Sequence, residues 1–527
     1  MLNLGFSVGE LEGRLAKALG RRCRLTPLNV RCTFPVFRGE TPEGETLFVK
    51  VGTAEEWRRS VGLLREIGDC GLFARFVTEE PISLGNYAVF VQEWKSSRTV
   101  FPEDMNERQR DRFVVACQAL SAALQGAKDF TPLADSGMSP ERLYADVRQY
   151  AERHPLASRC LRALLELPES RRSYGARPLR VVHGDFHAKN FAFSGDEFTC
   201  VYDFDKLTQG LACGDFVNAL MERFSCLGMS SGRRARLKAA AEALLRACPW
   251  PQDELTVAAN VVRLQFAARR IRKHPDSAWV AFDVWRRDRA LREFLECVSR
   301  AVPSAHAHLL DGCPLERVGW GGTRRNCYKI GETGFCVKFY KPAECYGLDD
   351  IPIRVQRDIA ARRFDFRRNS SSAEVTCYET FWMRQSAAIR SKLPPVVERV
   401  WHDKWGWGIL ENYYTNPDGT AIIPYEFEIG RQPSFAIRQE IYDQAKSLLS
   451  RLVACSAPFY EPGNFHVLIH ADGGIETKII DFEPVSKMAI PLEAVWPWFR
   501  RLKLKRKAKR YLRHLRNAYG VDDAGER

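Results

Sequence analysis

The sequence predicts an α+β protein with two domains in tandem, each of which begins with strands and continues with helices. In the first half, runs rich in β-branched and aromatic residues precede long stretches of helical periodicity. These strand-like runs are residues 29–36, 46–51 and 87–92. The second half repeats the order, with strand-like runs at residues 327–330, 334–340 and 397–410 and helical periodicity at 434–452. A length of 527 residues also exceeds that of a typical single domain.

The boundary between the two predicted domains follows from composition. Residues 302–312 are mostly small or polar, with histidines and a proline among them, which is typical of a linker. We therefore expect a first domain at residues 1–303, a linker at 304–312 and a second domain at 313–527.

Composition narrows the class of protein. Apolar residues make up 45% of the chain and charged residues 27%, which favours a globular protein with sizeable cores. Apolar runs such as Tyr87–Val91 are too short to cross a bilayer. Glu10 and Glu12 interrupt the stretch where a signal peptide needs an apolar core, so we expect a cytoplasmic protein. The 16 cysteines form no Cys-x-x-Cys pair and are expected to be free thiols, and the net charge of +14 favours anionic partners.

The residues most typical of catalysis lie between positions 181 and 205. An apolar run leads into the His-Gly-Asp triplet 183–185, and Asn190 follows five residues after Asp185. A short β-hairpin is predicted over residues 191–202, and Asp203 comes directly after it. A hairpin of this size can bring Asn190 and Asp203 to the same end.

This arrangement suits phosphoryl transfer. Asp185 can orient an attacking hydroxyl and accept its proton, and the oxygens of Asn190 and Asp203 can hold Mg²⁺. Lys50 lies mid-strand among apolar neighbours, where an amine needs an anionic partner, so we expect it to contact the phosphates of ATP. Glu56, on the helix that follows, is the predicted partner of Lys50.

These residues resemble the aminoglycoside phosphotransferase and choline kinase superfamily, over roughly residues 20–300. The triplet with Asn190 is similar to the catalytic loop of that superfamily, residues 201–205 to its metal-binding strand end, and Gly214-Asp215 to the pair that braces the loop. The resemblance implies a protein-kinase-like bilobal domain, a small antiparallel-sheet lobe followed by a helical lobe, that uses ATP and Mg²⁺. The chain departs from the pattern before Lys50, because residues 31–35 contain no glycine to help cradle phosphates.

A second group of residues repeats this logic in the second half. Its members are Gly319, Gly321, Gly322, Lys338, Glu374, Asn464 and Asp481. The glycines precede a predicted strand that carries Lys338, and Glu374 is placed on a helix to pair that lysine. A predicted hairpin separates Asn464 from Asp481, which repeats the pattern of two metal ligands.

With residues 325–328 and 462–464, this group resembles the PhoP-regulatory-network YrbL family of kinase-like proteins, over roughly residues 313–517. The resemblance implies a second kinase-like bilobal domain. Five residues before Asn464, where the base belongs, the chain has Phe459, and Glu461 is a nearby carboxylate. Three interpretations stay open: a domain that binds nucleotide without catalysis, a domain active through Glu461, or a domain that does neither.

Charge patterns give hints about partners. Residues 222–300 hold 16 Lys/Arg against 9 Asp/Glu, which disfavours polycationic acceptors and favours a sugar, a sugar phosphate or a lipid headgroup. The alternative is a solvated helix face. Residues 500–516 hold ten Lys/Arg and no acid on a predicted amphipathic helix. This helix could dock on an anionic membrane or glycolipid surface, bind nucleic acid, or pack on the second domain.

The sequence therefore predicts an ATP- and Mg²⁺-dependent phosphotransferase that acts on a hydroxyl of a small molecule, sugar or glycoconjugate. The first domain is expected to be catalytic and the second to bind nucleotide or regulate. Two alternatives stay open: a regulatory scaffold of two kinase-like domains without turnover, and catalysis in the second domain. A nucleic-acid binder has only charge in its favour, because no set of aromatic residues is interleaved with the basic ones for stacking.

Overall fold

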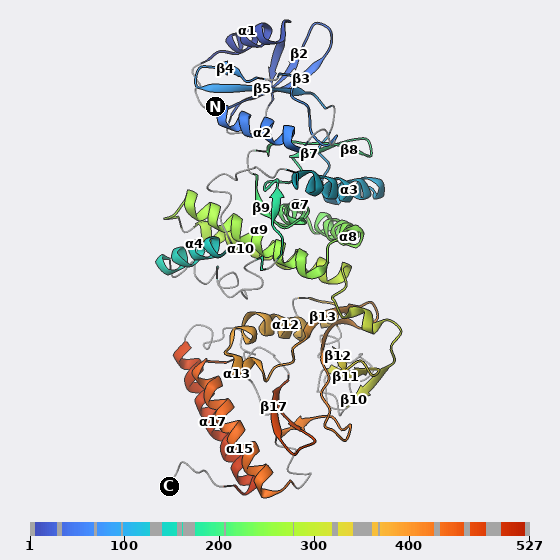
Figure 1. The fold of residues 1–527 in the computed structure, drawn as a ribbon, viewed down its shortest axis with the longest axis vertical. Helices are drawn as coiled ribbons and strands as arrows, with labels where there is room; N and C mark the ends of the chain where they lie inside the picture. The colour runs from blue at the N-terminus through green and yellow to red at the C-terminus, as the bar shows by residue number, and fades with distance from the viewer. Residues whose placement is uncertain are drawn as a thin grey trace. The chain divides into compact units, whose positions relative to one another are not determined.

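The computed structural model divides the chain into two compact units (Figure 1). The first comprises residues 1–165 and 169–301, and the second comprises residues 166–168 and 302–527. The structure describes residues 6–28, 34–67, 71–78, 80–95, 98–126, 140–154, 161, 174–175, 177–204, 207–277, 279–318, 325–340, 361–366, 369–425, 433–457, 464–480 and 497–521. Within these ranges no helix is both long and apolar enough to cross a bilayer, and the cysteines are free thiols, as predicted.

The first unit begins with a five-stranded antiparallel sheet in the order β1-β2-β3-β5-β4. Its strands are β1 (Arg24–Pro27), β2 (Val36–Glu40), β3 (Thr46–Gly52), β4 (Ile82–Leu84) and β5 (Tyr87–Glu93). Helix α1 (Val8–Leu19) precedes the sheet, and α2 (Ala54–Ile67) lies between β3 and β4 in the chain.

Side-chain alternation along β3 divides the two faces of this sheet. Leu47, Val49 and Val51 are fully buried in a core that also contains residues of α1. Because neighbouring side chains of a strand point to opposite faces, Lys50 lies on the other side. The register pairs Lys50 with Phe90 of β5, and Phe90 belongs to a separate cluster with residues of α2. The sheet thus presents Lys50 on its α2 side.

Two predicted strands of this unit, 46–51 and 87–92, are confirmed by β3 and β5. The strand predicted at 29–36 is wrong in its bounds, because β2 begins only at Val36. Pro35 has no amide hydrogen for a strand ladder, and residues 29–33 lie outside the described residues. Strand β1 has no clear sequence signal, since Leu25 is its one buried side chain.

The rest of the first unit is mainly helical. Its helices are η1 (Pro102–Asp104), α3 (Glu107–Leu124), α4 (Pro140–Arg153), α7 (Gly214–Phe224), α8 (Ser231–Ala247), α9 (Gln252–Lys273) and α10 (Trp279–Ala301). Two small antiparallel pairs join them: β6 (Arg180–Val182) with β9 (Thr208–Gly210), and β7 (Phe191–Ser194) with β8 (Glu197–Val201). Helix α9 contacts α4, α7 and α10, and is therefore central to this part. A sheet part is thus followed by a helical part, in the predicted order.

The second unit contains a sheet with the same strand order, β10-β11-β12-β14-β13. Its strands are β10 (Leu315–Val318), β11 (Arg325–Ile330), β12 (Phe335–Tyr340), β13 (Val397–His402) and β14 (Gly406–Asn412), and α12 (Ser370–Thr380) lies between β12 and β13 in the chain. The other elements are η3 (Ala307–Leu310), η5 (Trp382–Arg384), α13 (Ala387–Arg390), β15 (Ile423–Pro424), α15 (Phe435–Ala454), β16 (Phe465–Ile469), β17 (Ile475–Ile479) and α17 (Pro497–Tyr519). A helix after the third strand is therefore common to both units.

One predicted strand of this unit needs correction. Residues 397–410 are not a single strand, because the chain turns between His402 and Gly406 to form the hairpin of β13 and β14. Gly406 has a left-handed φ of 77°, and a Cβ there would lie 2.3 Å from the carbonyl oxygen of Arg363. Both the backbone angle and the close approach require glycine at this turn.

Candidate active site

The His-Gly-Asp loop follows strand β6 and is braced by the start of helix α7. Asp215, in the first turn of α7, is buried. Its carboxylate accepts hydrogen bonds from the backbone N–H groups of His183 (2.8 Å) and Gly184 (3.1 Å). Burial raises the pKa of the Asp215 carboxyl, while the nearby His183 and these two bonds oppose the rise. Asp215 thus holds the backbone just before Asp185, as expected for the pair Gly214-Asp215.

Asn190 is placed by the hairpin of β7 and β8. The N–H of Tyr202 donates to the carbonyl oxygen of Asn190 (2.8 Å), which closes the end of the hairpin. The side-chain amide nitrogen of Asn190 donates to the carbonyl oxygen of Asp185 (2.9 Å). Asn190 therefore joins the loop to the strand end that leads to Asp203, and its side-chain oxygen is the atom that can serve as a metal ligand.

Asp203 follows β8 and meets the lysine of the sheet. Lys50 Nζ lies 2.7 Å from Asp203 Oδ1, although the two residues are 153 positions apart in sequence. The Lys50 side chain is 16% exposed and that of Asp203 is 41% exposed, so the amine is largely enclosed while the carboxylate faces solvent. Glu56, the predicted partner of Lys50, belongs to α2, and its side chain lies outside the described residues.

The backbone of Asp203 is strained. Its φ is 65°, in the left-handed region that residues other than glycine seldom adopt. The buried ring of His183 supports this conformation through two contacts. Its Nε2 donates to the carbonyl oxygen of Tyr202 (2.7 Å), and the centroids of the His183 and Phe204 rings lie 4.9 Å apart. Strain that the surroundings hold in place is concentrated at functional sites. The loop and the strand end that carries Asp203 are thus one connected unit.

Two basic residues near Asp185 are not identified by the sequence analysis. His187 Nε2 lies 3.8 Å from Asp185 Oδ2, and both side chains are partly buried. Arg269 on α9 has an exposed side chain, yet desolvation by the surrounding protein lowers the pKa of its guanidinium, while Asp185 and Glu222 raise it.

The course of α9 supports this placement of Arg269. One turn earlier, Gln265 lines a small pocket together with Gly184 and Asn218. Arg269 Nε donates to the carbonyl oxygen of Gln265 (3.3 Å). Since residues four apart share a face of a helix, Arg269 continues the face that borders the His-Gly-Asp loop. The basic excess in residues 222–300 hints at such a cation, but only packing shows which one faces Asp185.

In the second unit, Lys338 lies on the third strand of the sheet, β12, as Lys50 does in the first. Lys338 Nζ is 2.5 Å from Glu411 Oε1 on the neighbouring strand β14. Glu374 on α12, the predicted partner of Lys338, is fully buried and forms an ion pair with Arg325 of β11. The structure thus shows partners for both residues that the sequence does not predict. Glu411 comes close because Cys336 pairs with Glu411 in the strand register, and Lys338 lies two residues along on the same face.

Asn464 begins the hairpin of β16 and β17 and repeats the backbone link of Asn190. The N–H of Ile480 donates to the carbonyl oxygen of Asn464 (2.9 Å), just as the residue before Asp203 donates to Asn190. Asp481 follows Ile480 directly in sequence but lies outside the described residues. So do Gly319, Gly321, Gly322, Phe459 and Glu461.

The geometry of the first unit agrees with a comparison against known families. Residues 24–250 match the phosphotransferase enzyme family. The matched residues include Lys50, Asp185, Asn190, Asp203 and Asp215. The match ends before α9, so Arg269 and the second unit lie outside it.

A comparison with solved structures found matches of low identity among phosphotransferases. A complex of APH(2'')-IIa with streptomycin and ATP is 15% identical, with a TM-score of 0.39, and the match covers 56% of this chain and all of that one. ADP-bound APH(2'')-Ib is 16% identical, with a TM-score of 0.38 and coverage of 55% and 98%. The macrolide 2'-phosphotransferase MphH from Brachybacterium faecium is 14% identical, with a TM-score of 0.34 and coverage of 54% and 97%. A comparison with curated proteins found no match.

Proposed function

We propose that the chain is an ATP- and Mg²⁺-dependent phosphotransferase that moves the γ-phosphate to a hydroxyl of a small molecule, sugar or glycoconjugate. The observation that carries the proposal is the contact between two residues distant in sequence: Lys50 lies 2.7 Å from Asp203. Asp203 in turn follows the hairpin whose other end, Asn190, is hydrogen-bonded to the backbone of Asp185. The match of residues 24–250 to a phosphotransferase family supports it. The chemistry is assigned to the first domain, residues 1–303.

The residues around Asp185 fit the roles that this reaction requires. Asp185 is the base that orients the acceptor hydroxyl and takes its proton. Asn190 and Asp203 offer an amide oxygen and a carboxylate, the oxygen ligands that Mg²⁺ prefers. When bound, the metal neutralises charge on the phosphates. Lys50, now paired with Asp203, is the cation that contacts the phosphates.

Asp215 and His183 act by holding these groups in place. Asp215 fixes the backbone before Asp185 through two N–H groups, and His183 fixes the carbonyl before Asp203. Neither is expected to touch the substrate. Their contribution is positional, because catalysis requires the base and the reacting hydroxyl to stay within hydrogen-bond reach.

We expect Asp215→Asn to lower the rate of phosphoryl transfer on the order of 10²-fold while ATP affinity stays unchanged, since displacing a catalytic group by about 1 Å has an effect of that size. An amide has one acceptor oxygen, so either His183 or Gly184 loses its partner. Steady-state kinetics and ATP titration measure the two effects separately. A parallel loss of ATP binding and of the folded state in thermal unfolding would show that Asp215 serves folding only.

The second domain, residues 313–527 after a linker at 304–312, is assigned a nucleotide-binding or regulatory role, in line with its resemblance to YrbL-like kinase domains. The shared strand order of the two sheets supports this assignment. The backbone bond from Ile480 to Asn464 supports it further, because it matches the bond from Tyr202 to Asn190, and Asp481 follows Ile480 in sequence as Asp203 follows Tyr202. Catalysis through Glu461 is the alternative for this domain.

The proposed function is tested with purified full-length protein and ATP labelled on the γ-phosphate. The protein is incubated with panels of sugars, sugar phosphates and glycolipids, and transfer, ATP hydrolysis and nucleotide binding are measured side by side. Transfer of label to a hydroxyl supports the proposal. Nucleotide binding with neither transfer nor hydrolysis supports the alternative, a scaffold of two kinase-like domains that bind ligands without turnover.

The acceptor is expected to be neutral or anionic, because residues 222–300 hold 16 Lys/Arg against 9 Asp/Glu and Arg269 lies on the face of α9 that borders the His-Gly-Asp loop. We expect Arg269→Gln to raise the KM for an anionic acceptor about 10- to 100-fold, since a hydrogen bond to a charged group contributes about 1.5–3 kcal/mol. The affinity for ATP should not change. Arg246→Gln, the same substitution at an exposed position of α8, is the control. An equal KM for both variants would remove Arg269 from acceptor recognition.

A further inference from the structure

Helices α15 and α17 form a groove on the second unit, and none of its lining residues is assigned a role above. The two helices pack side by side (Figure 1), and the groove between them has a volume of about 810 Å³. The part of its floor that solvent reaches is apolar, with Val453 from α15 and Leu502 and Leu512 from α17, while Leu449 and Ala508 of the lining are buried. A volume of this size lies in the range of small-molecule pockets, about 300–1,000 Å³.

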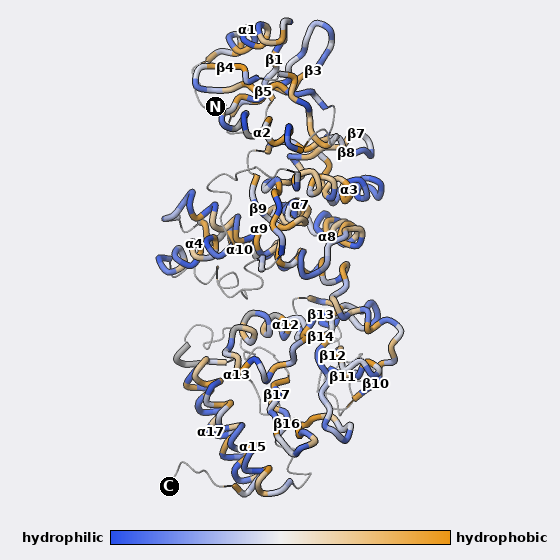
Figure 2. Tube along the Cα trace, viewed as in Figure 1, coloured by the Kyte–Doolittle hydropathy of each residue, from blue (hydrophilic) through white to orange (hydrophobic). Residues whose placement is uncertain are grey.

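The rim of the groove is strongly cationic. Arg501, Lys505, Lys509 and Arg513 recur every four residues along α17, and all four line the groove. Their side chains are exposed, and Figure 2 shows how hydrophilic most of this helix is. Like charges four residues apart destabilise a helix. This stripe of four cations therefore does not stabilise α17. The helix is held by its buried face of Leu504, Ala508, Tyr511 and Leu515.

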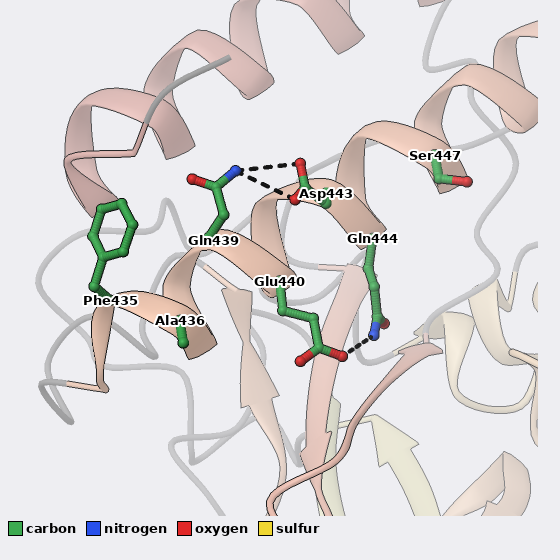
Figure 3. A pocket seen from close by; sticks show the side chains of 7 residues that line it. All are labelled: Phe435, Ala436, Gln439, Glu440, Asp443, Gln444 and Ser447. Carbon is green, nitrogen blue, oxygen red and sulfur yellow. Dashed lines mark hydrogen bonds between the residues drawn. The ribbon is translucent and has the colours of Figure 1, made fainter. Parts of the chain in front are cut away.

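No carboxylate neutralises this stripe among the residues that the structure describes. Among the described residues, no carboxylate lines the groove, and none lies within ion-pair distance of these four cations. The carboxylates of α15 are engaged elsewhere, at a different and shallow pocket (Figure 3). There Asp443 accepts hydrogen bonds from Gln439 (3.3 Å), and Glu440 accepts one from Gln444 (3.1 Å).

We propose that this groove binds an anionic phospholipid, with an acyl chain along the apolar floor and the phosphate at the stripe of Arg501, Lys505, Lys509 and Arg513. The apolar floor then contacts the acyl chain, and the cationic stripe contacts the phosphate. A nucleic acid would match the cations alone, and Tyr442, the aromatic residue of the lining, is 2% exposed and offers no stacking face. The inference is independent of phosphoryl transfer in the first domain.

The test uses full-length protein and vesicles of phosphatidylcholine with or without phosphatidylglycerol, in a sedimentation assay. Lys505→Ala combined with Lys509→Ala should weaken binding to the anionic vesicles about 30-fold, since each Lys or Arg near an anionic surface contributes about fivefold. The matched control is Arg506→Ala with Arg510→Ala, which removes the same charge from exposed positions outside the groove. The control should keep most of the binding. Alanine favours helix, so both variants should fold.

Two further measurements complete the test. Leu512→Gln, which places an amide on the floor, should weaken vesicle binding with the stripe intact, and thermal unfolding confirms that this variant folds. Competition with inorganic phosphate and with a short DNA duplex compares other anions. Equal losses for the two double variants would overturn the proposal in favour of diffuse charge attraction. Vesicle binding unaffected by Leu512→Gln, or DNA bound at the stripe in place of vesicles, would also overturn it.

Discussion

Asp185→Asn is expected to lower phosphoryl transfer by about 10²–10⁴-fold, the usual contribution of a positioned general base, while ATP still binds. Asparagine has nearly the same shape as aspartate but cannot accept the proton of the attacking hydroxyl at neutral pH. The bond from Asn190 ends on the backbone carbonyl of residue 185, so the substitution leaves it in place. Transfer from labelled ATP, measured together with ATP titration, separates lost chemistry from lost binding.

Two further variants show whether a loss of transfer is specific to Asp185. Asp196→Asn makes the same change at the tip of the β7–β8 hairpin, where the carboxylate accepts a hydrogen bond from the side chain of Asn106, and it should retain transfer. Lys338→Ala probes the second domain. If transfer survived Asp185→Asn but disappeared with Lys338→Ala, the chemistry would belong to the second domain and the assignment made here would be wrong.

The sequence predicts the hairpin that links two residues of the candidate site. Asp185, Asn190 and Asp203 lie within 19 consecutive residues, and the short hairpin between Asn190 and Asp203 follows directly from β-propensity and a turn signal. The backbone bond from Tyr202 to Asn190 closes that hairpin. Spacing within one hairpin is a local property, so a single sequence is enough to infer that its two ends meet.

The sequence predicts less about contacts between side chains on elements that are distant in the chain. Glu411 is near Lys338 only through the register of β12 with β14, and the sequence does not reveal this register because the run 397–410 hides the turn before Gly406. Arg269 is one of many cations after residue 222, and its position near Asp185 depends on how α9 packs against α7. Such pairings depend on tertiary structure, which outweighs local preference.

Glu374→Gln is expected to lower the free energy of unfolding of the second unit by about 3–5 kcal/mol, because removing the charge of one partner from a buried ion pair is strongly destabilising. Glu374 is fully buried and the Arg325 side chain is 9% exposed, so water cannot replace the lost carboxylate. Denaturant unfolding of the full chain measures the effect. The transition of the second unit should move to lower denaturant, while that of the first unit stays in place.

Two controls decide whether the effect comes from the buried charge. Glu332→Gln makes the same change in the turn between β11 and β12, at a side chain that is 93% exposed and paired with Lys329, and it should have no measurable effect. Arg325→Met combined with Glu374→Leu removes both charges and should recover most of the stability, since apolar residues of similar volume often replace a buried pair without loss. If the double variant were as unstable as Glu374→Gln, packing and not charge would explain the loss. Recovery in the double variant would show that the instability of Glu374→Gln comes from the buried charge of Arg325, since the fold is stable when both charges are absent.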